Sequence, residues 1–329
     1  MKFHNVSLNF IVHRRLMVKF LRALTFLRIF NCVGIIIESH LLSEKPRFKP
    51  YAATIEASRL CNLRCSFCPA NQEDSNCEGG ILDLAIFKKF VDENPQFLFL
   101  FFTGNGEPNL NEDLSEMIDY ARSKKIITIL STNGVKEVNS RISPDFLIFS
   151  LDFDNAMNYQ NYKRSDCFYV CLQNIKKYNL NKKKDTLTFL QFFIEQNGEQ
   201  KIEGFKTLNK KVDCNFIILK RPIVYSNKME RSDFGGMLLK TKSGKKLKCK
   251  YIYYQVYLTS KGLISICCND VKNIAILGDE QKDSFIDIWN NIEYQRFRKI
   301  NKSTGKIFNI CYYCPRLYRK SPLVRIVRN

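Results

Sequence analysis

Short apolar runs alternate with amphipathic stretches along most of the chain after Pro50. Several of the runs are continuously apolar, as in Phe97–Phe102 (FLFLFF), and do not alternate with polar residues. Such runs are typical of strands that are buried on both faces of a parallel sheet. The pattern predicts the following strands: Tyr51–Ala57, Phe97–Phe102, Ile126–Leu130, Phe146–Leu151, Thr186–Ile194 and Cys214–Leu219.

The stretches between these strands have the periodicity of helices with one apolar side. The predicted helices are Leu82–Val91, Glu112–Ser123, Cys167–Tyr178 and Gly198–Asn209, with a weaker one near Val135–Ser140. Strand–helix repeats joined by right-handed crossovers place their helices over a parallel sheet. The fold class that we expect is therefore α/β, a partial (β/α)6 barrel similar to about three-quarters of a TIM barrel.

The chain divides into three regions by composition. Residues 1–50 form a basic, amphipathic N-terminal extension, and residues 51–240 carry the barrel pattern. The lysine-rich stretch Lys240–Lys250 marks a boundary, and residues 241–329 form a small cysteine-bearing region with a basic C-terminal tail, which we expect to be solvated. The pattern in this last region predicts two short strands, Tyr251–Thr259 and Leu263–Cys267, followed by a helix near Ile286–Lys299. Its apolar content is low for an independent core, which favours a metal staple.

The N-terminal stretch Leu16–Ile37 is apolar but is interrupted by Lys19, Arg22 and Arg28. It falls short of the ~18 uninterrupted apolar residues that a membrane-spanning helix needs. It also lacks the layout of a secretory signal. The cations recur at nearly helical spacing, so we expect an amphipathic helix that either lies on a membrane surface or packs against the core.

Charge and cysteine content narrow the class of protein. The chain has 52 Lys and Arg against 32 Asp and Glu, a net charge of +20. This charge fits either an acidic partner or a soluble lysine-rich surface. The odd number of cysteines, 13, fits metal or redox chemistry in a reducing compartment better than a disulfide framework. We therefore expect a cytoplasmic protein, with membrane association as the alternative that the N-terminal stretch leaves open.

A CxxxCxxC sequence, Cys61, Cys65 and Cys68, directly follows the first predicted strand. Three thiolates on one tight loop can ligate three irons of a [4Fe–4S] cluster and leave the fourth iron open. Structural zinc prefers four protein ligands, and this loop offers three sulfurs without a nearby histidine. A catalytic dithiol is a further alternative, which the third cysteine weakens.

Polar motifs follow the next three strands as well. The second strand leads into GNGEP at 104–108, the third into STNG at 131–134, and the fourth ends in SLD at 150–152. Taken singly, each of these is an ordinary turn sequence. Together with the cysteines they lie at the carboxyl ends of four successive strands, where α/β barrels build their sites.

These motifs resemble the radical S-adenosylmethionine (radical SAM) superfamily along residues 53–197. The resemblance extends to the aromatic Phe67 before the third cysteine and to the family's GxGEP, ribose-contacting and following polar segments. It implies that the cysteines hold a [4Fe–4S] cluster whose open iron binds SAM. It also implies a set of SAM-binding residues: Phe67, Gly106, Glu107, Thr132, Asn133, Ser150 and Asp152.

A second set of cysteines lies in the C-terminal region. It consists of Cys249, Cys267, Cys311 and Cys314, the last two in a CxxC pair. Four thiolates can close the shell of a second [4Fe–4S] cluster, and four thiolates can equally hold structural zinc. Cys268 adjoins Cys267 and competes with it as a ligand, but Cys267 completes the sequence GxxxxC.

This region resembles the auxiliary-cluster domains called SPASM and, in its shortened form, twitch. The supporting residues are Gly262–Cys267, Asp270, Gly278, Trp289 and Arg298. A full SPASM pattern has further cysteines after the CxxC pair, and none follows Cys314 here. The resemblance therefore implies one auxiliary [4Fe–4S] cluster. Trp289, the only tryptophan, is expected to be a core anchor.

The sequence thus predicts a radical SAM enzyme that cleaves SAM reductively and abstracts hydrogen from an unactivated substrate carbon. If the auxiliary cluster accepts an electron, the reaction is an oxidation, and a sugar or cyclitol alcohol is the expected substrate. If that cluster only positions the substrate, modification of a peptide or an RNA is the alternative. From another class, the alternative is a non-catalytic, metal-stapled RNA-binding module. The expected partners are a small-molecule or peptide substrate and an electron donor such as a flavodoxin or ferredoxin, without nucleic acid.

Overall fold

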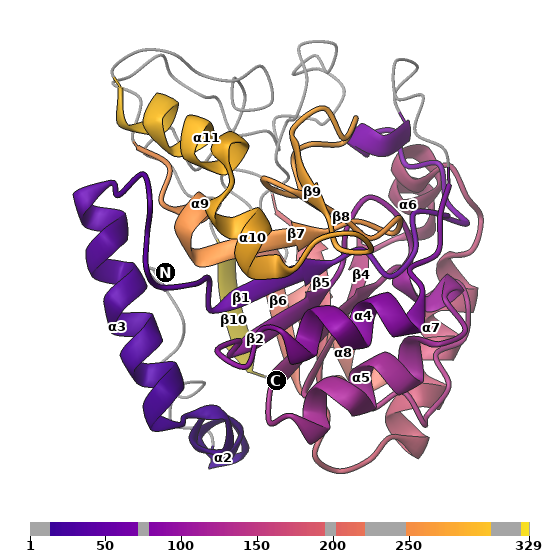
Figure 1. Ribbon diagram of the computed structural model, residues 1–329. Helices are drawn as coiled ribbons and strands as arrows, with labels where there is room; N and C mark the ends of the chain where they lie inside the picture. Colours follow the sequence, from indigo (N-terminus) through magenta and orange to yellow (C-terminus); the bar gives the residue numbers. More distant parts are fainter. Residues whose placement is uncertain (1–13, 72–78, 195–201, 221–247, 304–323, 329) are drawn as a thin grey trace.

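A ten-stranded mixed sheet runs through the computed structural model, which describes residues 14–71, 79–194, 202–220, 248–303 and 324–328 (Figure 1). The strands lie in the order β10-β6-β5-β4-β3-β2-β1-β7-β8-β9. Strands β1 to β6 are parallel to one another and adjacent in chain order. They are β1 (Ala52–Ile55), β2 (Phe99–Phe102), β3 (Ile127–Thr132), β4 (Phe146–Asp152), β5 (Leu187–Phe193) and β6 (Phe216–Lys220). The six predicted strands and the parallel α/β architecture are confirmed.

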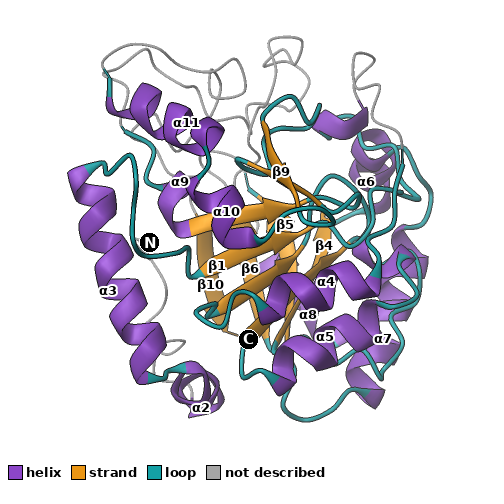
Figure 2. Ribbon diagram, viewed as in Figure 1, coloured by secondary structure: helices purple, strands orange, loops and turns teal. Residues whose placement is uncertain are grey.

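Helices flank this sheet in the manner of a barrel wall (Figure 2). They are α4 (Leu84–Asp92), α5 (Leu114–Ser123), α6 (Ala156–Lys163), α7 (Phe168–Asn181) and α8 (Ile202–Val212). Each long helix buries an apolar stripe, such as Phe87, Phe90 and Val91 of α4, in one core that it shares with the strands. The start of α4 is fixed by Asp83, whose carboxylate accepts hydrogen bonds from the backbone N–H groups of Ala85 and Ile86.

The C-terminal region extends the barrel's own sheet. Strand β7 (Gln255–Leu258) pairs in parallel with β1, and β8 (Leu263–Ser265) and β9 (Ile276–Asp279) continue outward as antiparallel strands. Helices α9 (Tyr251–Tyr254), α10 (Phe285–Asn290) and α11 (Ile292–Lys302) cover this side of the molecule (Figure 1). Trp289 is fully buried between the rings of Phe285 and Tyr294, which confirms its predicted role as a core anchor.

Two helices stand where the sequence predicts one N-terminal helix. They are α2 (Arg14–Ala23) and α3 (Phe26–Leu41), which meet at an angle of 88°. The break falls at Thr25, whose hydroxyl accepts a hydrogen bond from the backbone N–H of Arg28 and caps α3. Leu16 and Ala23 of α2 pack against strand residues such as Ile127, so α2 covers the amino-terminal edge of the sheet.

The predicted helix near Val135–Ser140 is wrong, because this stretch has no helical structure. Its backbone carbonyls are taken by side-chain donors instead. The amide of Asn174 donates to the carbonyls of Gly134 and Val135, and the amide of Asn109 donates to those of Lys136 and Glu137. Carbonyls engaged in this way do not form a helical ladder.

The other differences arise from tertiary contacts. Residues 251–254, predicted as the start of a strand, form α9, because Tyr253 bonds to the carbonyl of Ser43 and Tyr254 bonds to the hydroxyl of Ser39 on α3. Strand β10 (Val324–Arg328) pairs antiparallel with β6, where the sequence predicts a solvated basic tail.

The sequence pattern does not predict helix α6 or strand β9, and the predicted helix near 286–299 divides into α10 and α11.

Candidate functional site

The cysteine loop leaves the carboxyl end of β1 and turns tightly on itself. The backbone N–H of Cys68 donates to the carbonyl of Cys65 at 3.1 Å, and both the backbone N–H and the hydroxyl of Ser66 donate to the carbonyl of Tyr162 at the end of α6. These bonds hold the loop over the edge of the sheet. Cys65 is buried, and Cys61 and Cys68 are half-buried.

Burial raises the pKa of all three thiols, and that of Cys65 rises to about 12. The thiols are therefore protonated at neutral pH when no metal is bound. Metals bind the thiolate form, so loading this loop releases protons and replaces them with a positively charged metal. Three sulfur donors on one loop suit an iron–sulfur cluster.

Glu107 ties the GNGEP turn to the STNG turn. Its carboxylate is buried and accepts hydrogen bonds from the Thr132 hydroxyl at 2.6 Å and from the backbone N–H groups of Asn133 at 2.8 Å and Asn109 at 3.0 Å. Burial raises the pKa of Glu107, while these three donors act in the opposite direction. The carboxylate thus fixes the relative position of the ends of β2 and β3.

Both turns also touch the cysteine loop. The side-chain amide of Asn133 donates to Asn62 at 2.7 Å and lies 4.0 Å from the sulfur of Cys61. The backbone of Gly106 runs so close to the loop that a Cβ atom there would lie 2.3 Å from the carbonyl oxygen of Ser58. Glycine is required at this close approach of two backbones.

The end of β4 carries a buried ion pair. Asp152 lies at a bulge with φ of +68°, and its carboxylate accepts from Lys163 Nζ at 2.5 Å and from the Gln191 amide at 2.6 Å. Lys163 also donates to the carbonyl of Ser150 at 2.9 Å and lies 5.5 Å from the centre of the Phe67 ring. Burial is the largest single influence on Lys163 and opposes its charge, but the Asp152 carboxylate together with the nearby Cys65 and Cys171 sulfurs raises its pKa.

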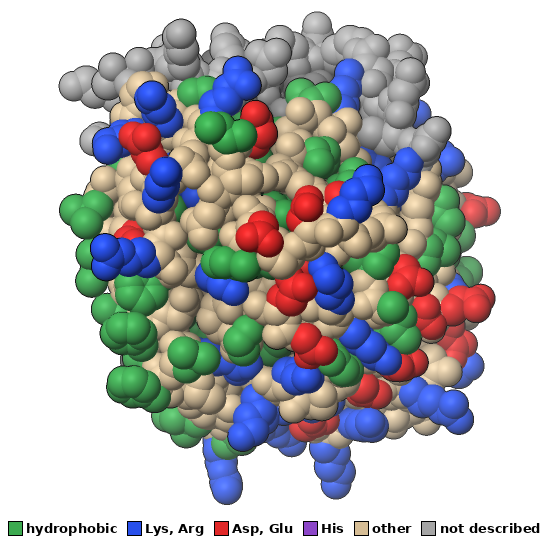
Figure 3. Space-filling view, in the orientation of Figure 1, with side chains coloured by type: hydrophobic (Ala, Val, Ile, Leu, Met, Phe, Trp, Pro, Cys, Tyr) green, Lys and Arg blue, Asp and Glu red, His purple; other side chains and the backbone are tan. Residues whose placement is uncertain are grey.

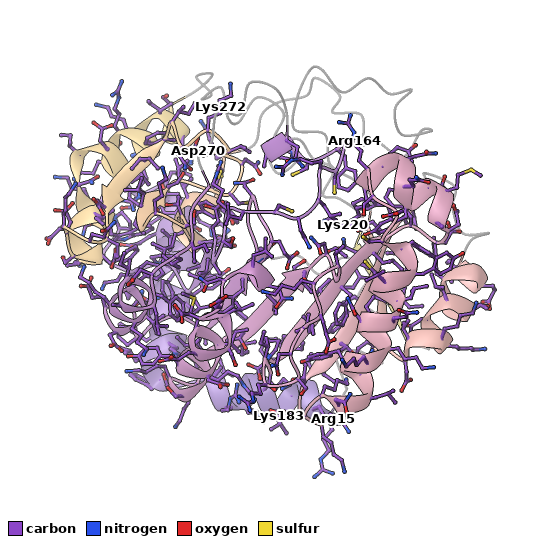
Figure 4. All side chains as sticks on the ribbon, turned by 90° about the vertical axis from the view of Figure 1, so that its right-hand side faces the viewer. Arg15, Arg164, Lys183, Lys220, Asp270 and Lys272 are labelled. Carbon is purple, nitrogen blue, oxygen red and sulfur yellow. The ribbon has the colours of Figure 1, made fainter. Side chains whose placement is uncertain are left out.

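Ser150 completes this group, because its hydroxyl lies 3.2 Å from the hydroxyl of Ser131 on β3. The structure therefore brings together all the residues predicted to bind SAM at the carboxyl edge of β1 to β4. Figure 4 shows this edge from the side, with Lys220 at the end of β6 and Arg164 after α6 toward it, and with Arg15 and Lys183 at the opposite edge. The roles of the predicted residues in binding SAM stay predictions.

A second polar cluster joins β1 to the C-terminal region. Glu56, directly after β1, is fully buried and accepts hydrogen bonds from the Tyr257 hydroxyl at 2.6 Å, Arg59 at 3.0 Å and the backbone N–H of Ser260 at 3.0 Å. Arg59 reaches on to the carbonyl of Val271, in the loop that follows Cys267 and Cys268. The cysteine loop and the C-terminal cysteines are thus connected through buried side chains.

Side-chain hydrogen bonds hold the segments around the described C-terminal cysteines. Asn301 of α11 brackets Cys249 by accepting from its N–H at 2.8 Å and donating to its carbonyl at 2.9 Å. Buried Asp270 closes the turn after Cys267, since its carboxylate accepts from the Ser265 hydroxyl at 2.8 Å and the backbone of Ala275 at 2.8 Å. Cys311 and Cys314 lie outside the described residues. The choice between Cys267 and Cys268 stays a prediction.

Comparison with known proteins supports this arrangement. Residues 249–315 match SPASM, an iron–sulfur cluster-binding domain. Fe-coproporphyrin III synthase of Methanosarcina barkeri is 35% identical over 100 residues, which are 30% of this chain and 24% of that protein. Mycofactocin maturase MftC of Mycobacterium tuberculosis is 30% identical over 112 residues, which are 32% of this chain and 28% of that protein. The chain thus matches about a quarter of the length of these curated relatives.

Solved structures extend the likeness to the fold. SuiB of Streptococcus suis, bound to its precursor peptide SuiA, superimposes with a TM-score of 0.59 at 14% identity, covering 88% of this chain and 74% of that one. The protein anSMEcpe, bound to AdoMet and the Cp18Cys peptide, superimposes with a TM-score of 0.53 at 16% identity, covering 82% and 88%. The chain thus resembles radical SAM proteins in its cysteine loop and its fold, and it carries a C-terminal SPASM domain.

The side chains that can donate to a metal fit, by their chemical type, the iron–sulfur clusters that the resemblance implies. Among the residues that the structure describes, no three Cys, His, Asp or Glu side chains are arranged as a ready-made site for a single metal ion. The loop instead offers three thiols without a fourth protein donor, which suits a cluster with one open iron. In the SPASM domain, two of the four predicted ligands, Cys249 and Cys267, lie within the described residues.

Sequence reasoning missed Glu56, Lys163 and Tyr257. Glu56 carried a signal, because it is a polar residue at the carboxyl end of the first strand, as the other motif residues are at theirs. Lys163 carried none, since a lysine at the end of a short helix is ordinarily solvated. Tyr257 lies inside an apolar strand run, and only the pairing of β7 with β1 places its hydroxyl near Glu56.

Proposed function

We propose that this protein is a radical SAM enzyme that modifies a peptide, by abstracting a hydrogen atom from one of the peptide's carbon atoms. The proposal rests on the gathering of the cysteine loop, the GNGEP and STNG turns and the Asp152–Lys163 pair at one edge of the sheet. Open α/β folds bind their ligands at this edge.

In the proposed enzyme, Cys61, Cys65 and Cys68 hold a [4Fe–4S] cluster, and SAM binds at the adjoining strand ends. With both groups bound, one electron from the cluster would cleave SAM into methionine and a 5′-deoxyadenosyl radical, and this radical would take a hydrogen atom from a substrate carbon. The SPASM domain holds one auxiliary [4Fe–4S] cluster through Cys249, Cys267, Cys311 and Cys314. A flavodoxin or ferredoxin is the proposed electron donor.

The chain's own residues provide orientation and exclude water. Glu107 holds the ends of β2 and β3 in one fixed arrangement, so that the SAM-binding backbone needs little reorganisation on binding. Lys163 places a buried positive charge beside the cysteine loop, where its ion pair with Asp152 keeps it in place. The rings of Phe67, Phe153 and Phe193 pack together at this edge and reduce access of water.

A peptide is the proposed substrate because two structures of similar fold contain one: SuiB with SuiA, and anSMEcpe with the Cp18Cys peptide. Oxidation of a sugar or cyclitol alcohol, with the auxiliary cluster as electron acceptor, is the alternative reaction. The non-catalytic RNA-binding module predicts zinc in place of iron and leaves the polar strand ends without a role.

The test is reductive cleavage of SAM by the full chain after anaerobic reconstitution with iron and sulfide. With dithionite and SAM, the wild-type protein is expected to form 5′-deoxyadenosine, measured by liquid chromatography. The variant Cys65→Ser should lose at least about 100-fold of this rate, the lower end of losses from removing one essential group at an active site. Cys167→Ser, a half-buried cysteine outside the loop, is the matched control and should keep the wild-type rate.

Candidate peptides deuterated at carbon then test the substrate class. Transfer of deuterium into 5′-deoxyadenosine from a peptide supports the proposal. Transfer from deuterated sugar alcohols, without transfer from peptides, would support the alternative reaction and reject the peptide. A fully iron-loaded protein that does not cleave SAM would reject the enzyme itself.

A further inference from the structure

Helices α2 and α3 bury several polar residues beside Leu16, Ala23 and Ile35, and they expose many apolar ones. Their buried positions include Lys19, Arg28, Asn31 and Ser39, which are polar or charged. A helix at the surface of a soluble domain normally buries its apolar residues and exposes its polar ones. Two questions follow: what holds the polar residues on the buried side of the helix pair, and what covers the apolar residues on its exposed side.

On the inner side, buried polar anchors fix the orientation of the pair. Asp145, fully buried before β4, accepts from Lys19 at 3.0 Å and from Arg22 at 3.0 Å. Arg28 is also buried, and its guanidinium donates to the backbone carbonyls of Ala23, Pro95, Lys124 and Lys125. Removing either partner of such a buried contact is costly, so the pair does not rotate to hide its outer face.

On the outer side, large apolar side chains are exposed along both helices. Phe26 is 86% exposed, Leu41 69%, Leu21 66% and Val18 58%. The remaining members of this exposed apolar face are Met17, Leu24, Leu27, Ile29, Phe30, Val33, Ile36 and Ile37. Figure 3 shows apolar side chains along the left edge of the molecule, where α3 runs in Figure 1. A contiguous apolar face of this kind marks an interaction surface.

The charges around this face are mainly positive. Glu38 is the only acidic residue in either helix, and its carboxylate is occupied by the backbone N–H groups of Arg47 and Phe48. Exposed cations flank both ends of the helix pair. Arg14, Arg15, Lys183 and Lys184 lie at one end, and Lys45 and Arg47 at the other. Figure 4 shows Arg15 beside Lys183 at the edge opposite the candidate site.

We infer that α2 and α3 lie in the headgroup layer of a membrane that contains anionic lipids, with their exposed apolar face toward the acyl chains. Apolar side chains that enter the acyl boundary and cations that meet anionic headgroups are the two requirements of an interfacial helix. No single helix in the described part of the chain is long and apolar enough to span a bilayer. The α2–α3 pair meets that test only when both helices are joined across their 88° bend.

The charge distribution favours lipid over a second copy of the chain. A symmetric dimer through this face would bring the flanking arginines of both copies together. The described helices offer no free carboxylate on the face to neutralise them, because Glu38 is already engaged. The inference does not depend on the proposed chemistry, since the candidate site lies at the carboxyl edge of the sheet, away from α2.

The test is flotation of the full-length, iron-loaded protein with lipid vesicles. We expect it to float with vesicles of phosphatidylcholine containing about 30% phosphatidylglycerol, and to bind pure phosphatidylcholine at least ~10-fold more weakly, since each basic residue adds to the attraction for anionic lipid. Raising the salt from about 0.1 M to about 0.5 M should lower the affinity several-fold, because the charge attraction is screened.

Variants with matched controls separate the apolar face from general hydrophobicity. Leu21→Gln/Phe26→Gln/Ile37→Gln removes three exposed apolar side chains and should lower vesicle affinity at least ~20-fold, because their burial in lipid is lost. Met157→Gln/Tyr169→Gln/Leu180→Gln removes three comparably exposed side chains from α6 and α7 and should leave binding unchanged. Helical circular dichroism checks that both triple variants are folded.

A tryptophan reporter measures insertion directly, because the only native tryptophan, Trp289, is buried far along the chain. In Phe26→Trp, vesicles should shift the emission to shorter wavelength, and lipids brominated on the acyl chain should quench it. Absence of binding to anionic vesicles would overturn the inference. Equal binding by the two triple variants would overturn it as well. So would a dimer in solution, measured by light scattering, that the Leu21/Phe26/Ile37 variant converts to a monomer.

Discussion

At the scale of single residues, the site depends on polar side chains that are buried and mutually satisfied. Lys163 and Asp152 form an ion pair with both side chains almost completely hidden from solvent, 4% and 3% exposed. A charge at such a position is tolerated only while its partner remains. The pair therefore holds the end of β4, α6 and the Phe67 ring together.

Lys163→Met should expose this dependence. The variant leaves the Asp152 carboxylate buried with the Gln191 amide as its remaining side-chain donor in the described structure, and should lower the free energy of unfolding by about 3 kcal/mol. Anaerobic urea unfolding followed by circular dichroism measures the change. Lys177→Met is the matched control, because Lys177 pairs with Glu137 at the exposed surface and should contribute under about 1 kcal/mol. Equal stability of the two variants would contradict the role of Lys163.

The place of a residue in the fold could be predicted from the sequence where a motif directly follows a strand. Glu107, Asn133 and Asp152 meet at the edge of the sheet where their strands predict them to be. Lys163 and Tyr257 could not be found in this way, because only the folded structure places Lys163 against Asp152 at the end of β4 and Tyr257 against Glu56.

At the scale of elements, the site is built from loops whose backbones touch. Gly106 is the tightest of these contacts, since a Cβ atom would lie 2.3 Å from Ser58 O and 2.6 Å from the Arg59 backbone. Backbone atoms cannot move aside as the end of a flexible side chain can. A side chain at this position must therefore push the GNGEP turn away from the cysteine loop.

Gly106→Ala should therefore impair the barrel cluster. We expect the reconstituted variant to retain about half of the wild-type iron, because one of two four-iron clusters is lost. Iron analysis after anaerobic gel filtration measures this. Gly204→Ala is the matched control, because a Cβ there meets nothing within 4 Å; in a helix the change should stabilise the protein by about 0.5–1 kcal/mol. Full iron content in Gly106→Ala would contradict the account.

The elements that the sequence predicted well are those whose own apolar pattern decides their structure, such as β2 and α4. The failures lie where distant groups decide. Asn109 and Asn174 take the carbonyls of residues 134–137 and prevent a helix there. Tyr253 and Tyr254, aromatic residues with a preference for strands, are helical because their hydroxyls bond to Ser43 and Ser39.

At the scale of the whole molecule, the SPASM region and the barrel form one continuous sheet. The parallel pairing of β7 with β1 places Tyr257 against Glu56, and Arg59 links Glu56 to the loop after the C-terminal cysteines. The sequence predicted both regions but not this junction, because no local pattern encodes which strand pairs with β1. The same holds for β10, which borders β6 through pairing alone.

The central claim, a radical SAM enzyme with one cluster in the barrel and one in the SPASM domain, is tested most directly by metal content. Iron, acid-labile sulfide and zinc should be measured per chain after anaerobic reconstitution, in the wild type and in Cys61→Ala/Cys65→Ala/Cys68→Ala. The account predicts about eight irons in the wild type and about four in the triple variant, without zinc. Zinc bound at the C-terminal cysteines would show that this region does not hold an auxiliary iron–sulfur cluster. Absence of iron under all conditions would contradict the claim that the protein is a radical SAM enzyme.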